Sequence, residues 1–388
     1  MLPRLRNPAV VVNCETAGVG IIHSLSLEGI DIITVERDWP PTFGRFSRYP
    51  KLKLTYRPWR GETLVDALLR AQDLFEGKGI LFPSTDRDLE ALILGFDRLA
   101  ARYCVPASPH IGMRIFEKNW QYELAERTGT PLPRHTRFLA GQQPDLYGFR
   151  FPLIIKPSSR AAAEGEETFR LRILDSPEAL ARCLEQIARE FPGRAFQIAE
   201  NIPGEPDQLY TVGSYSNREG KVLRSYTGRK VTQYPYHHGM ASVAESVELP
   251  KHVVESARAL LEEAKFHGIS QVEFKFDKRD GQYKLLEING RSWLWVKLAA
   301  FSGVNLPLIQ YYDLTDDPRV ARAVAEPQRN DRFFVFDYHV KRNKLPSERQ
   351  RIQQLRRSKT LIPAMDEPTD RWLRLAHRVV STAKLLRR

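Results

Sequence analysis

Alternating apolar and polar residues mark two neighbouring segments, 269–277 and 283–289, as β-strands. The five residues between them contain an Asp-Gly pair, which is a strong signal for a hairpin turn. Side chains alternate between the two faces of a strand, so the apolar residues share one face of the hairpin and the polar residues the other. The polar face is expected to carry two carboxylates and a carboxamide: Glu273, Glu287 and Asn289.

This polar face has two interpretations. Carboxylate and amide oxygens aimed at one point suit Mg²⁺, which takes one or two carboxylates and completes its shell with water and phosphate oxygens. The alternative is an amphipathic hairpin whose charged face is solvated. The hairpin pattern fits both interpretations, so the choice depends on the residues upstream.

The first hundred residues alternate between strand-like and helix-like patterns, which predicts a parallel α/β sheet. The expected elements are strand 8–14, helix 18–27, strand 31–35, helix 63–76, strand 80–82 and helix 86–103. The glycine pattern at Gly18 and Gly20 is incomplete, so dinucleotide binding is the lesser interpretation of this Rossmann-like opening. Ser84 and Thr85 stand where open α/β sheets place ligand loops, although capping the following helix is the simpler role.

Three further features lie between this region and the hairpin. Lys156 ends a short apolar strand, where its ammonium suits ATP phosphates but is also an ordinary strand-end lysine. Glu200 and Asp207 flank a turn at a spacing of seven residues, and both are acceptors suited to an amine or to hydroxyl groups. Lys118 lies in a helix-like segment that, taken alone, has no distinguishing feature.

In this order, and with the sequence Glu287-Ile-Asn-Gly-Arg291, these features resemble the ATP-grasp ligases, and most of all the predicted carboxylate–amine ligases of the D-aspartate ligase type. The resemblance implies two α+β lobes that clamp ATP, behind a Rossmann-like pre-ATP-grasp domain and before a basic helical tail. The implied divisions are 1–112 for the N-terminal domain, 113–318 for the ATP-grasp domain with lobes at about 131–210 and 211–315, and 319–388 for the C-terminal extension.

The resemblance also implies site residues and cofactors, namely ATP with Mg²⁺, or Mn²⁺ in its place. Nucleotide binding is expected from Lys118, Lys156, Ser158, Ser159, Glu200, Ile202 and Asp207. Metal binding is expected from Glu273, Glu287 and Asn289. Contacts with the transferred phosphoryl group or an anionic substrate are expected from Arg229, Lys230 and Arg291. The family's glycine-rich flap is replaced here by residues 158–165, which contain a single glycine.

The implied reaction joins a small-molecule carboxylate to an amine through an acyl-phosphate. Two alternatives share the same motifs: an ATP-grasp kinase or carboxylase with another acceptor, and a binding protein that holds ATP without turnover. Neither the acid nor the amine can be read from the sequence. The Trp293-Leu-Trp295 segment is expected in the core or in a substrate wall.

Composition limits the remaining classes. The chain has 388 residues, is 42% apolar and carries a net charge of +12, of which +9 lies in residues 330–388. Nucleic-acid binding is not expected, because no recognition motif accompanies this charge. Residues 366–388 predict a basic amphipathic helix with an apolar stripe through Trp372, Leu375 and Val379 that docks on the fold or, alternatively, rests on an anionic membrane. Three widely spaced cysteines fit a reducing, cytoplasmic setting.

Overall fold

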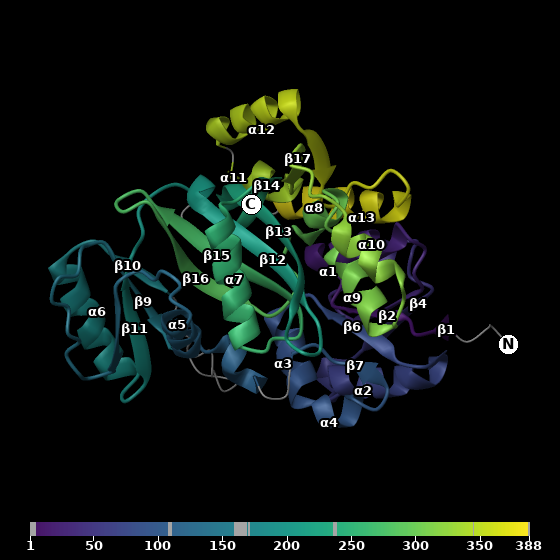
Figure 1. The fold of residues 1–388 in the computed structure, drawn as a ribbon, viewed down its shortest axis with the longest axis horizontal. Helices are drawn as coiled ribbons and strands as arrows, with labels where there is room; N and C mark the ends of the chain where they lie inside the picture. Colours follow the sequence, from purple (N-terminus) through teal and green to yellow (C-terminus); the bar gives the residue numbers. More distant parts are fainter. Residues whose placement is uncertain are drawn as a thin grey trace.

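The structure is a computed structural model that describes residues 5–107, 111–158, 169, 171–235, 239–343 and 345–386, with the side chains of 383–386 excepted. Three larger sheets organise these residues (Figure 1). An N-terminal sheet and a small sheet lie at opposite ends of the view, and a large sheet lies between them. The mixed α/β fold class expected from the sequence is confirmed.

The N-terminal sheet is parallel, in the order β4-β3-β2-β6-β7. Its strands are β2 (Ala9–Val12), β3 (Ile32–Arg37), β4 (Leu52–Tyr56), β6 (Gly79–Pro83) and β7 (Tyr103–Cys104), and β1 (Leu5–Arg6) pairs separately with β5 (Phe75–Glu76). Both faces are covered, because Ala9 and Val11 pack toward α1 (Thr16–Ser26) whereas Val10 and Val12 pack toward α2 (Leu64–Ala71). The run of apolar residues in β2 is typical of a strand buried on both sides.

Three details of this region differ from the expected elements. The helix expected at 63–76 ends as α2 at Ala71, and its last two residues form β5. Strand β4 was not expected, because Lys51 and Lys53 interrupt its apolar pattern at the edge of the sheet. The expected helix 86–103 is divided into α3 (Asp86–Leu94) and α4 (Phe96–Leu99). The division falls at Gly95, where a Cβ atom would lie 2.5 Å from a methyl group of Val65, so close contact with α2 requires glycine.

The small sheet is antiparallel, in the order β10-β9-β11-β8. It consists of β8 (His135–Leu139), β9 (Leu153–Pro157), β10 (Arg172–Leu174) and β11 (Ala195–Glu200). Helix α6 (Pro177–Glu190) buries Leu180, Cys183 and Ile187 against one face. The opposite face of the small sheet faces the large sheet, and residues of both sheets line the cavity between them.

The large sheet has the order β16-β15-β12-β13-β14-β17-β18. Its strands are β12 (Leu209–Ser216), β13 (Val222–Tyr234), β14 (Met240–Ser246), β15 (Gly268–Asp277), β16 (Gln282–Asn289), β17 (Arg332–Val335) and β18 (Thr360–Pro363). Helices α5 (Lys118–Arg127) and α7 (Lys251–Glu263) share a core with one face of this sheet. Helices α8 (Val296–Phe301) and α9 (Leu306–Leu314) join it to the N-terminal part.

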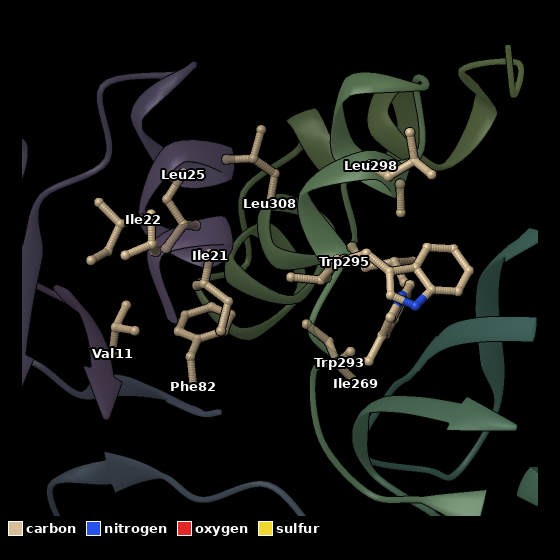
Figure 2. Close-up of a cluster of buried hydrophobic side chains, with 14 of the residues drawn as sticks. Val11, Ile21, Ile22, Leu25, Phe82, Ile269, Trp293, Trp295, Leu298 and Leu308 are labelled. Atoms are coloured by element: carbon tan, nitrogen blue, oxygen red, sulfur yellow. The ribbon is translucent and has the colours of Figure 1, made fainter. Parts of the chain in front are cut away.

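A continuous apolar core therefore connects the first and last thirds of the chain. Figure 2 shows side chains of α1 and the N-terminal sheet meeting those of α8, α9 and the segment before α8. Trp293 and Trp295 are both 1% exposed in this core, so the expectation of core packing is the one the structure supports. Gly20 of α1 lies so close to α8 that a Cβ atom would contact Val296 and Lys297 at 3.2–3.3 Å. Its role here is helix packing.

The C-terminal extension is built into the large sheet. Strands β17 and β18 continue that sheet beyond β14, so the expected division at residue 318 does not coincide with a break between sheets. Around them lie α10 (Arg319–Ala325), α11 (Asp337–Asn343), α12 (Pro346–Ser358) and α13 (Arg371–Leu386). In the described part of the chain, no helix combines the length and apolarity needed to cross a bilayer.

Helix α13 docks on the fold, but not through the stripe expected from the sequence. Leu373, His377 and Ser381 are buried, whereas Trp372, Leu375 and Val379 are 71%, 52% and 60% exposed. Asp370, which precedes the helix, fixes this rotation: it is fully buried and accepts hydrogen bonds from Ser47 Oγ at 2.6 Å and Arg48 N at 3.0 Å. It also contacts His23 Nε2 at 3.2 Å. The face of α13 that is buried is thus the one next to the hydrogen bonds of Asp370, and the apolar stripe stays exposed.

Candidate active site

A cavity of about 730 Å³ lies between the small sheet and the large sheet. We call it the interlobe cavity. It collects most of the charged residues that the sequence analysis singled out, although they come from five different strands and one helix. Among its lining residues are Lys118, Tyr122, Lys156, Glu200, Ile202, Lys230, Glu273, Lys275 and Glu287.

The expected hairpin is confirmed and forms one wall of this cavity. Strands β15 and β16 are antiparallel, and Glu273 lies directly opposite Glu287. A bulge after Glu273 shifts the register, so that Phe274 pairs with Leu285. Gln121 of α5 holds β16 in place, since its buried side chain bonds both the N–H and the C=O of Ile288. The two carboxylates are thus set side by side on one face.

Each carboxylate is paired with a lysine from another element. Lys118 Nζ donates to Glu287 Oε2 at 2.7 Å, and Lys230 Nζ lies 3.1 Å from Glu273 Oε1. Lys118 is the main cause that holds the pKa of the Glu287 carboxyl well below its usual range, and Asn289 adds to the effect by donating to Glu287 Oε1 at 3.0 Å. Glu287 is therefore an anion at neutral pH.

Lys156 has a different environment. Its ammonium lies 4.9 Å from the centre of the Tyr122 ring, in a cation–π contact. Burial lowers its pKa to about 8, and Glu287 opposes that shift only in part. Burial also raises the pKa of the Tyr122 phenol. A lysine with little local compensation of its charge is suited to meet an anion that enters the cavity.

The hairpin offers oxygen donors of the kind that Mg²⁺ and Mn²⁺ prefer. Glu273 and Glu287 supply carboxylates. Asn289, which is 9% exposed, does not line the cavity: its amide N–H faces Glu287 and its Oδ1 faces Arg291, so the side chain would have to turn to add an oxygen donor. Within the described residues, no three His, Cys, Asp or Glu side chains gather as a metal-binding group. The donor set thus fits a cation that takes two carboxylates from the protein and further oxygens from a phosphate-bearing ligand.

The other end of the cavity holds the predicted hinge residues. Glu200 and Ile202 line it, and Glu200 Oε1 accepts from the N–H of Arg150 at 3.1 Å while Oε2 faces Arg279 at 3.2 Å. Asp207 is not among the lining residues. Its carboxylate instead lies 3.3 Å from the guanidinium of Arg351 on α12, because the turn at Pro206–Gln208 directs it away from the cavity.

The predicted phosphate-covering residues are described only in part. Ser158 is buried beside Lys118, whose N–H donates to its carbonyl oxygen at 3.0 Å. The Ser158 hydroxyl is buried with no hydrogen-bond partner in the part of the chain that the structure describes, and Ser158 is not among the lining residues of the cavity. Ser159 and the rest of segment 159–165 lie outside the described residues.

Arg229 does not reach the interlobe cavity, although Lys230 does. Neighbouring residues of a strand point to opposite faces, and Arg229 shares its face with Tyr210 and Phe274, on the side covered by α7. Its guanidinium pairs with Glu245 at 2.7 Å. Of the two residues expected to face a phosphate, Lys230 alone lines the interlobe cavity.

Arg291 lines a second cavity and contacts Asn289 next to the interlobe cavity. Residues 287, 289 and 291 follow one another at every second position, and Arg291 Nη2 lies 3.5 Å from Asn289 Oδ1. Asp86, the first residue of α3, accepts from Arg291 Nε at 2.8 Å and holds the guanidinium. Strand β16 and the residues after it therefore connect the two cavities.

This second cavity has a volume of about 410 Å³. It is lined by Glu15, Thr16, Ala17, Phe43, Ser84, Thr85, Asp86, Met240, Arg291, Leu294, Phe336, Tyr338, His339, His377 and Ser381. In the loop before α3, the capping role is confirmed, because Thr85 forms a capping box with Asp88. Ser84 and Thr85 also line the second cavity.

Several of these residues were missed by sequence reasoning. Gln121 and Tyr122 are buried residues of α5, three and four positions after Lys118, so helical spacing would have placed them on the same face as Lys118. Asp86 directly follows the loop after β6, and its position at the end of a parallel strand would have pointed to it. His339 and His377 come from the C-terminal extension, and no local pattern links them to a site near residue 84.

Comparisons with known proteins agree with this arrangement. The L-amino acid ligase of Bacillus licheniformis superposes with a TM-score of 0.58 at 14% identity, covering 84% of this chain and 79% of that one. The biotin carboxylase of Campylobacter jejuni gives 0.58 at 14% identity, over 83% and 72%. The D-alanine–D-alanine ligase of Bacillus anthracis, solved with ATP, gives 0.52 at 17% identity, over 81% and 98%.

The chain has the ATP-grasp fold. No model of a known protein family matches it. In sequence it is similar to the D-aspartate ligase of Enterococcus faecium, with 25% identity over 214 residues, or 51% of this chain. The chain spans half the length of that relative. The resemblance to ATP-grasp ligases drawn from the motifs is thereby confirmed.

Proposed function

We propose that the protein is an ATP-dependent carboxylate–amine ligase that forms an amide bond through an acyl-phosphate. The observation that carries the proposal is the pairing of Glu273 with Glu287 across the hairpin, in a cavity that also holds Lys118, Lys156 and Lys230. Two opposed carboxylates with three lysines suit a triphosphate with a divalent cation. Similarity to D-aspartate ligase supports the same reaction class.

In this proposal, the lysines neutralise phosphate charge. Lys118 and Lys230 are held by Glu287 and Glu273, whereas Lys156 has no such ion pair with any described residue. Glu273, Glu287 and Asn289 would hold Mg²⁺ or Mn²⁺, which lowers the cost of negative charge on the phosphates when bound. Phosphoryl transfer depends chiefly on such positioning and charge neutralisation.

The nucleoside end is assigned to the hinge. Ile202 and Glu200 line the cavity there, and a carboxylate and backbone groups suit the amino group of adenine. Glu200 would have to share its charge with Arg279. Asp207 remains a candidate for the ribose hydroxyls only if its ion pair with Arg351 opens.

Arg291 is placed for the second half of the reaction. The carboxylate substrate attacks the γ-phosphorus of ATP, ADP leaves, and the amine then displaces phosphate from the acyl carbon. Because Arg291 stands between the interlobe cavity and the second cavity, its guanidinium would stabilise negative charge on the acyl-phosphate. Asp86 keeps it in position.

We place this reaction in the cytoplasm, where ATP is available. Cys14, Cys104 and Cys183 are all free and buried, which suits a reducing compartment.

The test is ADP release with Mg²⁺ across a panel of amino acids and other carboxylates, in the presence of hydroxylamine to trap the acyl-phosphate. We expect one acid to stimulate ADP release and to yield a hydroxamate. A Glu287→Gln variant should bind no competent metal complex and give neither product, whereas Arg229→Gln, on the opposite face of the sheet, serves as the matched control. ADP release without any hydroxamate, for every acid tested, would contradict the ligase proposal.

A further inference from the structure

The second cavity is assembled from three separate parts of the chain. The N-terminal part contributes residues of α1 and of the loop before α3, the large lobe contributes Arg291 and Leu294, and the C-terminal extension contributes residues of α11 and α13 together with Phe336. None of these parts forms the cavity alone. It therefore exists only when α13 is docked, and Asp370 fixes that docking.

The wall supplied by the C-terminal extension is aromatic. The ring of His377 lies edge-on to Phe43, with ring centres 5.3 Å apart, and is stacked with Phe336 at 6.1 Å. Phe336 also contacts His339 at 4.5 Å. Leu294 adds an aliphatic side chain. Such a surface favours a ligand with an apolar or aromatic body.

The charged groups of the cavity are of opposite sign but unequal number. Glu15 and Asp86 bring two carboxylates, and Arg291 brings one guanidinium. Burial lowers the pKa of both His339 and His377, so both imidazoles are neutral near pH 7. Arg291 is paired with Asp86, and the lining residues that the structure describes thus bring one more carboxylate than guanidinium, which favours a cationic ligand.

His377 combines burial with an unsatisfied polar atom. The side chain is 8% exposed, and its Nε2 atom is buried with no hydrogen-bond partner among the described residues. Buried polar atoms normally have such a partner, and an exception needs an explanation. His339 presents the same feature at Nδ1. Both histidines line the second cavity, so a small rotation of either ring would offer a nitrogen to a polar group of a ligand.

We propose that the second cavity binds the amine substrate, that this substrate has a cationic amino group and an apolar or aromatic body, and that His377 contacts it. This inference rests on the proposed function, because that function requires an amine close to Arg291. When the amine attacks, a C–N bond forms, the C–O bond to phosphate breaks, and phosphate leaves with the electron pair. The ammonium group first loses a proton and so becomes nucleophilic, and a neutral imidazole is a suitable acceptor for that proton. The nitrogen loses a second proton to the departing phosphate as the amide forms.

Direct binding tests the inference without turnover. Calorimetry would compare phenethylamine and isopentylamine with aspartate and glutamate as ligands of the full chain. We expect the apolar amines to bind at least roughly tenfold more tightly than the acidic ones. His377→Phe keeps the ring in the aromatic wall but removes both nitrogens, and should weaken phenethylamine binding by roughly tenfold. Val379→Ser, on the outer face of the same helix, is the control and should bind as the wild type does.

Catalysis provides a second readout. His377→Phe should still form hydroxamate from the acid and hydroxylamine. For amide formation with the amine, we expect this variant to have a lower kcat and a higher KM for the amine. His377→Gln keeps a hydrogen-bonding group, and should recover part of the amine binding. Preferred binding of the acidic amines, or equal binding by His377→Phe and Val379→Ser, would overturn the inference. If the wild type forms no hydroxamate, the ligase proposal is contradicted. The calorimetric comparison of amines then still decides whether the second cavity binds an apolar amine.

A second inference concerns the opposite face of α13. Trp372, Leu375 and Val379 form an exposed stripe at positions i, i+3 and i+7. Arg371 and Arg378 flank the stripe, and residues 330–388 carry 15 Lys and Arg against 6 Asp and Glu. An exposed apolar stripe in a basic surrounding is complementary to an anionic bilayer surface. We propose that this face rests on anionic lipid while the inner face closes the second cavity.

Vesicle co-sedimentation tests this second inference. The full chain should sediment with vesicles of phosphatidylcholine and phosphatidylglycerol, and less so with phosphatidylcholine alone or at high salt. The double variant Trp372→Ser, Leu375→Ser should lose this binding, whereas Leu94→Ser, which changes a similarly exposed leucine of α3, should not. Equal binding to both kinds of vesicle would overturn the inference. So would a solution dimer that the double variant abolishes, because a second copy of the chain would then cover the stripe.

Discussion

Lys156 and Lys118 line the same cavity, but their replacement should change stability in opposite directions. Burial lowers the pKa of Lys156 from 10.5 to about 8, so the folded state disfavours its charged form. One pKa unit corresponds to about 1.36 kcal/mol, which puts the upper limit of this penalty at about 3 kcal/mol. Because the side chain lines a cavity that water enters, we expect Lys156→Met to stabilise the fold by about 1–2 kcal/mol at pH 7.

The same pKa difference predicts how the free energy of unfolding changes with pH. Between pH 8 and 10.5 the unfolded chain keeps the Lys156 proton and the folded chain does not, so stability of the wild type rises with pH in that window. The advantage of Lys156→Met should therefore be complete below about pH 8 and fade as the pH approaches 10.5. Urea unfolding at pH 7 and at pH 9.5 measures both values.

Lys118→Met is the matched variant. It removes the 2.7 Å ion pair with Glu287, whose low pKa depends mainly on that lysine. The Glu287 side chain is 35% exposed, so the loss is smaller than for a fully buried pair, and we expect about 1 kcal/mol of destabilisation. Both variants should lose ATP binding, measured by calorimetry.

Two results at pH 7 and pH 9.5 would contradict a stability cost at Lys156. If Lys156→Met lowers the free energy of unfolding at pH 7, or if its effect is the same at pH 7 and pH 9.5, the lysine is not held at a cost in the folded state. Lys221→Met, in an exposed position of the turn before β13, controls for the general effect of removing a lysine.

Three further predictions concern single residues. Glu287→Gln should lower kcat by roughly 100-fold or more while circular dichroism stays unchanged, because it removes a predicted metal ligand and no core contact. Asp370→Asn should weaken the hydrogen bonds that dock α13, lowering the free energy of unfolding by about 1–3 kcal/mol and speeding amide exchange in that helix. Gly204→Ala should weaken ATP binding, measured by calorimetry, because Gly204 has φ +114° and its Cβ would lie 1.4 Å from Gln208 Oε1 at the hinge.

The part of the site that sequence could predict is the part that local periodicity determines. The hairpin brings Glu273 opposite Glu287 because alternation and an Asp-Gly turn fix both register and face. The same rule shows why Arg229 fails where Lys230 succeeds: alternation along β13 can send only one of two adjacent residues into the cavity. Applied to that pair, the rule would have made the distinction from the sequence.

Long-range pairing explains what the sequence could not predict. Asp207 is turned toward Arg351, which follows it by 144 positions, and no local pattern announces that ion pair. Strand β17 joins the large sheet beside β14 although α7 to α10 intervene, so its place depends on packing that periodicity does not encode. The rotation of α13 is the clearest case. Its apolar stripe predicts one buried face, and the hydrogen bonds of a single carboxylate select another.

That selection has a consequence for how the molecule works. If the apolar stripe of α13 had been buried, His377 would lie on an outer face, and the second cavity would lack its aromatic wall. The Asp370 anchor instead turns His377 inward beside Phe43 and Phe336 and leaves Trp372 outside. Burying an imidazole in place of a tryptophan sacrifices apolar burial, which is the main favourable term in folding. A sequence that keeps this arrangement against its own hydrophobic pattern places a requirement on the inner face of the helix, and substrate contact is a requirement of that kind.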